Sequence, residues 1–262
     1  MKSIFRSTSS ILLLSVLFLA SCVPYKTMYK QSVTLYNQAV TTETKFRLDQ
    51  VKKSVTNFND SPAKKDFKVA YDTINSFISQ YKDKLATDNL YGNALALKAM
   101  CEYGLEMNNV APSTAEQALT YLKSSTSSDK SRDLAMMTAM PGLIMGNQLY
   151  DKLPADDKTL GTVEYKGLAD MATSASESLK KGQEELKGEP KSKMNQYLVM
   201  SELAVYKNWL DAVFNTVDKT STDAAVAQKR QREDDILKLA KGAIGKLSDP
   251  IVAKQWKTLI GI

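Results

Sequence analysis

The chain has 262 residues, and 35 lysines and arginines against 29 aspartates and glutamates give it a formal net charge of +6. A surplus this small over this length does not indicate nucleic-acid binding, while an apolar content of 43% predicts a buried core. Histidine is absent, which excludes Ser-His-Asp and Cys-His catalysis as well as histidine-based zinc sites. We expect neither a metal nor another cofactor.

The first residues have the layout of an export signal. Lys2 and Arg6 supply positive charge, an apolar run follows over residues 11–20, and the segment ends in Leu-Ala-Ser-Cys at Cys22. The run is too short and wrongly flanked for a spanning helix. This ending resembles the lipobox of bacterial lipoproteins. The resemblance implies cleavage between Ser21 and Cys22, a diacylglyceryl group on the thiol, and usually an acyl chain such as palmitate on the freed amine. The alternative is an ordinary secretory signal in which Cys22 is incidental.

The lipobox resemblance implies a domain plan and a location. The plan consists of a cleaved signal peptide, a lipidated tether and one all-helical domain, at residues 1–21, 22–26 and 27–262, with possible sub-units 27–128 and 129–262. Val23 stands where some bacterial lipoproteins carry an aspartate that retains them in the inner membrane. We therefore expect an anchor in the outer membrane, with the body facing the periplasm.

Helical periodicity begins after the tether. Residues 27–58 lack glycine and proline. They predict one long helix, or two shorter ones broken near residues 41–42, where the apolar stripe weakens. Ser61 followed by Pro62 is typical of an N-cap and a first helical position. The helix that they open carries apolar residues three and four apart as far as Tyr81.

A third helical stripe runs from Leu90 to Leu105 and places Cys101 on its buried side. If Cys22 is lipidated, Cys101 has no disulfide partner, and we expect a small apolar core residue rather than a reactive thiol. Ser113 and Glu116 have the spacing of a capping box, so we expect the next helix to begin there.

Three segments of this region alternate small and large residues: Ala70 to Phe77, Ala94 to Leu105, and Ala118 to Ser125. Together they resemble a degenerate tetratricopeptide array, a family of paired antiparallel helices with such alternation on the second helix. The resemblance covers residues 62–125 and implies stacked helix pairs that form an extended concave surface.

The segment from Asp129 to Tyr150 is predicted to be a helix that Pro141 kinks or breaks. A cluster of methionines lies in it, for which three interpretations are open. Thioethers bind Cu(I), flexible methionines can line an apolar groove for a ligand or partner, and methionine also fills the core around a bent helix. The candidate ligand or partner surface consists of Met136, Met137, Met140 and Met145.

The remaining sequence predicts four more helices. One spans Leu160 to Leu186, and Ser192 caps an apolar helix that we take as the centre of the C-terminal half. Asp223 begins a helix with ion-pair spacing on an exposed face, and Asp249 begins the last. No stretch alternates with period two for long. The predicted fold class is all-α, with antiparallel helix pairs stacked as a tetratricopeptide-like right-handed array or a helical bundle.

The lipobox, the helix pairs and the missing catalytic residues favour a non-enzymatic scaffold or adaptor that binds another envelope protein at the membrane. The alternative is a carrier or receptor for a small apolar ligand held between helices near Pro141, for example as an accessory part of a transport system. An enzyme would have to use carboxylate pairs such as Glu184-Glu185, which stand among lysines on predicted surface faces. We therefore expect that the chain is not an enzyme.

Overall fold

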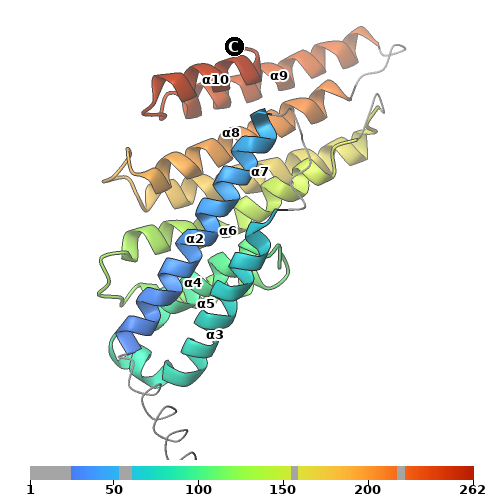
Figure 1. Ribbon diagram of the computed structural model, residues 1–262. Helices are drawn as coiled ribbons and strands as arrows, with labels where there is room; N and C mark the ends of the chain where they lie inside the picture. The colour runs from blue at the N-terminus through green and yellow to red at the C-terminus, as the bar shows by residue number, and fades with distance from the viewer. Residues whose placement is uncertain (1–24, 53–60, 155–158, 217–221) are drawn as a thin grey trace, which may run out of the picture. The chain divides into compact units, whose positions relative to one another are not determined.

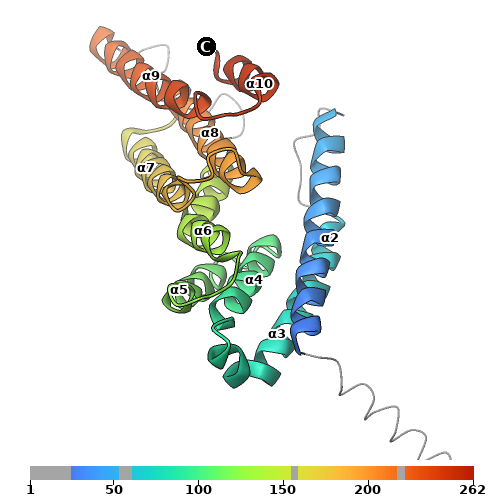
Figure 2. The ribbon, with the colours of Figure 1, turned by 90° about the vertical axis from the view of Figure 1, so that its left-hand side faces the viewer.

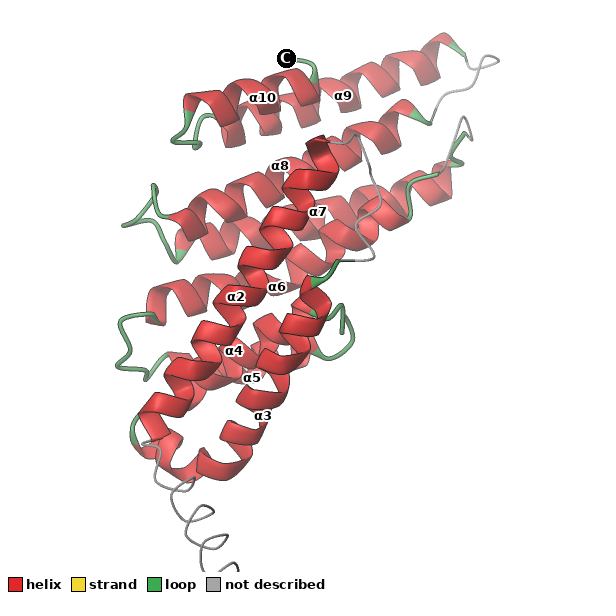
Figure 3. Ribbon diagram, viewed as in Figure 1, coloured by secondary structure: helices red, strands yellow, loops and turns green. Residues whose placement is uncertain are grey.

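The computed structural model describes residues 25–52, 61–154, 159–216 and 222–262, and all regular structure in these ranges is α-helical (Figure 3). The helices are α2 (Tyr25–Lys52), α3 (Ala63–Thr87), α4 (Tyr91–Gly104), α5 (Ala111–Leu122), α6 (Lys130–Asp151), α7 (Thr162–Glu184), α8 (Lys193–Phe214), α9 (Asp223–Ile244) and α10 (Pro250–Ile260). The predicted all-α class is confirmed for these residues. The predicted signal peptide lies outside them.

The chain forms two compact units, Met1–Asp88 and Asn89–Ile262. The division therefore falls between α3 and α4, not at residue 128, where the sequence pattern placed a possible boundary. The reason is that α5 and α6, on either side of that position, pack against each other.

In the first unit, α2 and α3 pack together as a hairpin. Helix α2 continues through residues 41–42, where the hydroxyls of Thr41 and Thr42 donate to the carbonyls of Asn37 and Gln38, at 2.8 and 3.1 Å. It also begins at Tyr25, inside the segment predicted to be a tether. Ser61 Oγ accepts a hydrogen bond from the amide of Ala63, the first residue of α3. The N-cap position itself is occupied by Pro62, one residue later than predicted.

The second unit is a stack in two layers. Each helix from α4 to α10 packs against the next one along the chain. In addition, α6 packs against both α4 and α8, and α8 packs against α10, whereas the described parts of α5, α7 and α9 make no contact with one another. Helices α4, α6, α8 and α10 thus form a continuous row, and α5, α7 and α9 stand on the other side of it (Figure 1, Figure 2).

Helices α6 and α7 are in very close contact. A β-carbon on Gly142 would lie 2.6 Å from the carbonyl oxygen of Ala175, and one on Gly182 would lie 2.7 Å from the carbonyl oxygen of Ala135. Helix α6 is a single helix without the predicted break at Pro141. Pro141 is exposed, while the neighbouring Gly142 is buried against α7. This packing holds the helix together across the proline.

Two predicted N-caps are found, at the starts of α8 and α10. Ser192 Oγ accepts from the Asn195 amide at the start of α8, and Asp249 Oδ1 accepts from the Ile251 amide at the start of α10. The predicted capping box of α5 is wrong, because the helix begins at Ala111 and so encloses both residues of the box. Proline is favoured in the first helical turn, and Pro112 stands there.

Candidate functional site

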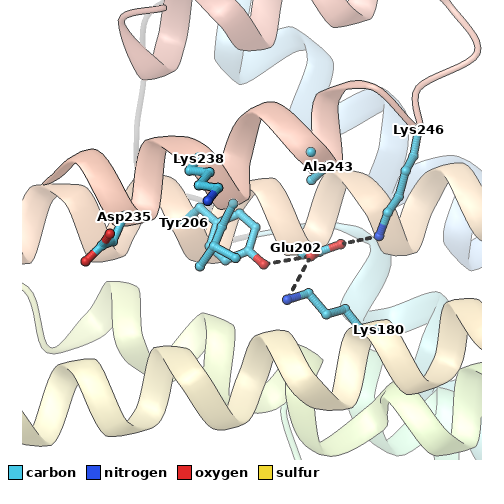
Figure 4. A pocket seen from close by; sticks show the side chains of 9 residues that line it. Lys180, Glu202, Tyr206, Asp235, Lys238, Ala243 and Lys246 are labelled. Carbon is cyan, nitrogen blue, oxygen red and sulfur yellow. Dashed lines mark hydrogen bonds and ion pairs between the residues drawn. The ribbon is translucent and has the colours of Figure 1, made fainter. Parts of the chain in front are cut away.

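A pocket of about 560 Å³ lies in the second unit over α8, between α7 and α9 (Figure 4). Buried side chains of α8 form its floor, and lysines from α7, from α9 and from the turn after α9 surround its opening. The lining residues are Lys180, Glu202, Tyr206, Asp235, Lys238, Leu239, Gly242, Ala243 and Lys246.

Glu202 is the centre of this pocket, and its side chain is only 1% exposed. Its Oε1 accepts a hydrogen bond from the Tyr206 hydroxyl at 2.7 Å, and its Oε2 accepts one from Gln183 Nε2 at 2.8 Å. Lys180 Nζ lies 3.8 Å from Oε1, and Lys246 Nζ lies 3.6 Å from Oε2. A buried charge requires such partners, and here they tie α7, α8 and the end of α9 together.

The sequence directs Glu202 inward through its position on α8. Leu198, Glu202 and Tyr206 are four residues apart and therefore share one face of the helix. Leu198 and Tyr206 are both 0% exposed. The side chains of Lys180 and Lys246 are 40% and 46% exposed, so their stems cover the pocket wall while their ammonium groups remain in reach of solvent.

Cationic groups are in excess in the pocket. Burial, followed by the charge of Glu202, raises the pKa of Tyr206, so the phenol stays neutral and donates its proton to the hydrogen bond. Both oxygens of Glu202 accept a hydrogen bond. Lys180, Lys238 and Lys246 outnumber the two carboxylates, and each ammonium has three donors. A carboxylate that approaches from outside can therefore bridge the lysines.

A second pocket, of about 460 Å³, lies at the start of α7. It is mainly apolar, and Val163 at its edge is 85% exposed. Its lining residues are Lys152, Pro154, Leu160, Val163, Glu164, Gly167, Leu168 and Met171.

The four methionines predicted as a ligand or partner surface all lie in α6. Met136, Met137 and Met140 are 3%, 1% and 0% exposed, and Met145 is half-buried. None of them lines either of the two pockets described above. They pack in the interior of the stack, in the manner of the core-filling interpretation.

The structure describes only one of the two cysteines, Cys101. Ser21 and Cys22, the predicted cleavage and lipidation residues, lie outside the described residues, so lipidation stays a prediction. Cys101 is unpaired and 0% exposed. Its predicted place in the core is therefore confirmed. Burial, with a smaller contribution from the neighbouring Glu102, raises the pKa of its thiol to about 12.

Two further carboxylates, Asp133 and Glu102, are buried in the second unit. Asp133 Oδ2 accepts from Asn93 Nδ2 at 2.6 Å, and Asn93 Oδ1 accepts from Ser125 Oγ at 2.5 Å. Burial raises the pKa of Asp133 to about 6. Glu102 is 0% exposed, and its nearest cation is Lys98 at 3.8 Å. Burial raises the pKa of Glu102 as well. Asp133 thus links α6 to α4, and neither carboxylate lines a described pocket.

Sequence reasoning missed Glu202 because the composition of α8 drew attention to its apolar residues. The spacing of Leu198, Glu202 and Tyr206 was the available signal, since a carboxylate between two core positions must be buried. Among the described residues, no three carboxylate or cysteine side chains stand together as a metal site. No described helix is long and apolar enough to cross a bilayer.

Comparisons of the chain with protein-family models, with curated proteins and with solved structures give no match.

Proposed function

We propose that this chain is a lipid-anchored helical scaffold of a bacterial cell envelope, facing the periplasm from the outer membrane, which holds another envelope protein and catalyses no reaction. The observation that carries the proposal is the continuous row of α4, α6, α8 and α10. In such a stack each further helix extends an open surface instead of closing around a ligand.

The pocket around Glu202 is the proposed contact point with the partner. Its lysines are complementary to an acidic side chain, and Leu239 beside them is 39% exposed. Interfaces concentrate their binding energy in a few residues, and charge complementarity at the rim selects the partner. The partner therefore presents a carboxylate to Lys180 and Lys246, with an apolar neighbour against Leu239.

The carrier alternative requires space between helices near Pro141. A β-carbon on Gly142 would lie 2.6 Å from the carbonyl oxygen of Ala175, so α6 and α7 leave no room there even for a methyl group. The buried methionines of α6 fill the adjoining interior. These contacts support the scaffold over the carrier.

A thermal-shift screen of the purified protein against lipids, amino acids, sugars and metal ions tests the choice. A carrier gains stability by mass action, about 2.7 kcal/mol at one hundred times the dissociation constant, and its melting temperature rises in a saturable way. The scaffold proposal predicts no saturable rise with any of these compounds. A reproducible, saturable rise would support the carrier.

A further inference from the structure

Exposed lysines lie at the end of the α2/α3 hairpin where α2 begins and α3 finishes. They are Lys26, Lys30, Lys82 and Lys84, and the carboxylates beside them are Asp83 and Asp88. We call the end with these four lysines the basic end.

Aromatic rings stiffen this basic end. The Phe77 ring lies 6.5 Å from Tyr25, 6.1 Å from Tyr29 and 5.4 Å from Tyr81, between ring centroids. The Lys84 ammonium lies 4.3 Å from the centre of the Tyr25 ring. Tyrosine and lysine together are enriched where proteins meet the headgroup layer of a membrane, because a tyrosine ring is amphipathic and a lysine attracts anionic lipid.

The basic end is also the end next to the predicted anchor. Cys22 precedes Tyr25, the first residue of α2, by three positions. Three residues of fully extended chain span at most about 11 Å. A lipid on Cys22 therefore holds the start of α2 at the membrane, and the last turn of α3 lies beside that start (Figure 1, Figure 2).

We propose that this end of the hairpin rests on the anionic headgroups of the membrane that holds the lipid anchor, so that α2 and α3 stand end-on to the bilayer. The inference rests on the lipid anchor of the proposed function. It adds a second, electrostatic contact, which fixes an orientation that one lipid anchor alone does not fix.

Fluorophores placed at the two ends of α3 test this orientation in the full chain, processed and acylated by the cell and reconstituted into nanodiscs. Ala86→Cys places a label near the basic end, and Val69→Cys places one roughly 25 Å away along the helix. Both sites are exposed. Cys101 does not compete for the label, because burial raises its pKa to about 12. The readout is quenching by a headgroup-attached quencher, in phosphatidylcholine with and without phosphatidylglycerol.

We expect the label at residue 86 to be quenched several-fold more than the label at residue 69, most strongly with phosphatidylglycerol. The double variant Lys26→Glu with Lys30→Glu should remove the dependence on anionic lipid, while the matched double variant Lys45→Glu with Lys65→Glu should retain it. Equal quenching at both sites in an acylated chain, or equal effects of the two double variants, would overturn the inference alone. Failure of the cell to acylate Cys22 would overturn the anchor itself, and the inference with it.

Discussion

The carbonyl oxygen of Ala135 on α6 lies 2.7 Å from the position that a β-carbon on Gly182 of α7 would occupy. The same glycine would bring that carbon within 2.8 Å of the Ala139 methyl group. Glycine destabilises an isolated helix, but Gly182 allows α7 to approach α6 this closely. Because the two layers of the stack meet at such contacts between α6 and α7, the stack should be sensitive to a single added methyl group here.

Gly182→Ala should lower the free energy of unfolding by about 1–3 kcal/mol, the usual cost of overpacking a core. The control lies on the same helix: Gly167 is exposed, and nothing lies within 4 Å of its added β-carbon. Gly167→Ala should raise the free energy of unfolding by roughly 0.5–1 kcal/mol, because alanine restricts the unfolded chain and favours the helix. Urea unfolding of both variants measures the difference, and equal effects would contradict the close packing of α6 and α7.

Glu202→Ala should lower the free energy of unfolding by about 2–5 kcal/mol. The Tyr206 hydroxyl and the Gln183 amide would each lose a buried partner, at roughly 1–3 kcal/mol per group. Asp211→Ala provides a control on the same helix, because the carboxylate of Asp211 is 41% exposed and pairs with Lys207. A partly exposed pair contributes about 0–1 kcal/mol. Urea unfolding compares the two, and a cost for Glu202→Ala as small as that for Asp211→Ala would speak against the buried network.

Asp133 should make the stability fall as the pH rises from about 4 to about 6. Its pKa is raised from 3.8 to about 6 in the folded state, mainly by burial, so the folded protein binds the proton more tightly than the unfolded chain does in this window. The stabilisation that protonation gives is complete below pH 4 and lost above pH 6. It amounts to up to about 3 kcal/mol, at 1.36 kcal/mol for each pKa unit.

The variant Asp133→Asn cannot titrate at this position, so its stability relative to the wild type should increase between pH 4 and pH 7. Denaturant unfolding at a series of pH values measures this difference. Asp170→Asn, at an exposed carboxylate beside Lys166, serves as the control and should show little change. A constant difference between wild type and Asp133→Asn across the series would mean that Asp133 titrates normally.

Cys22→Ala should abolish incorporation of a labelled fatty acid and leave the chain soluble or unprocessed. The wild type should carry the label and sediment with membranes, because the acyl chains provide most of the membrane affinity. Equal labelling of both forms would refute the lipobox interpretation.

The helices could largely be predicted from the sequence because their signals are local. Apolar spacing of three and four residues marked each one, and Ser192 and Asp249 marked two starts through side chains that reach only their own first turn. The start of α5 was misplaced because Ser113 and Glu116 match a capping box while Pro112 fits the first helical turn equally well. The two local signals predict different first residues for α5, and the sequence alone does not choose between them.

The candidate site could not be predicted, because it depends on which helices meet. Lys180, Glu202 and Lys246 come from three segments that the fold brings together, and no local pattern links a lysine on α7 to a turn after α9. Gly182 illustrates the same limit. Its effect on an isolated helix is unfavourable, and only the position of α6 reveals its role. The methionines of α6 were a candidate site because thioethers can bind a metal or line a ligand groove. The burial of Met136, Met137 and Met140, which depends on the fold, places them in the core instead.

Site-specific photo-crosslinking in the native host tests most directly whether the lysine pocket binds a protein. A photoreactive residue at Leu239 should form an adduct with one envelope protein. Lys238→Glu should reduce that adduct several-fold without changing the melting temperature, because Lys238 is exposed and lines the pocket. Lys241→Glu, an equal change of charge at an exposed position on the same helix, should leave it intact. No adduct at Leu239, or the same loss from both charge reversals, would contradict the scaffold.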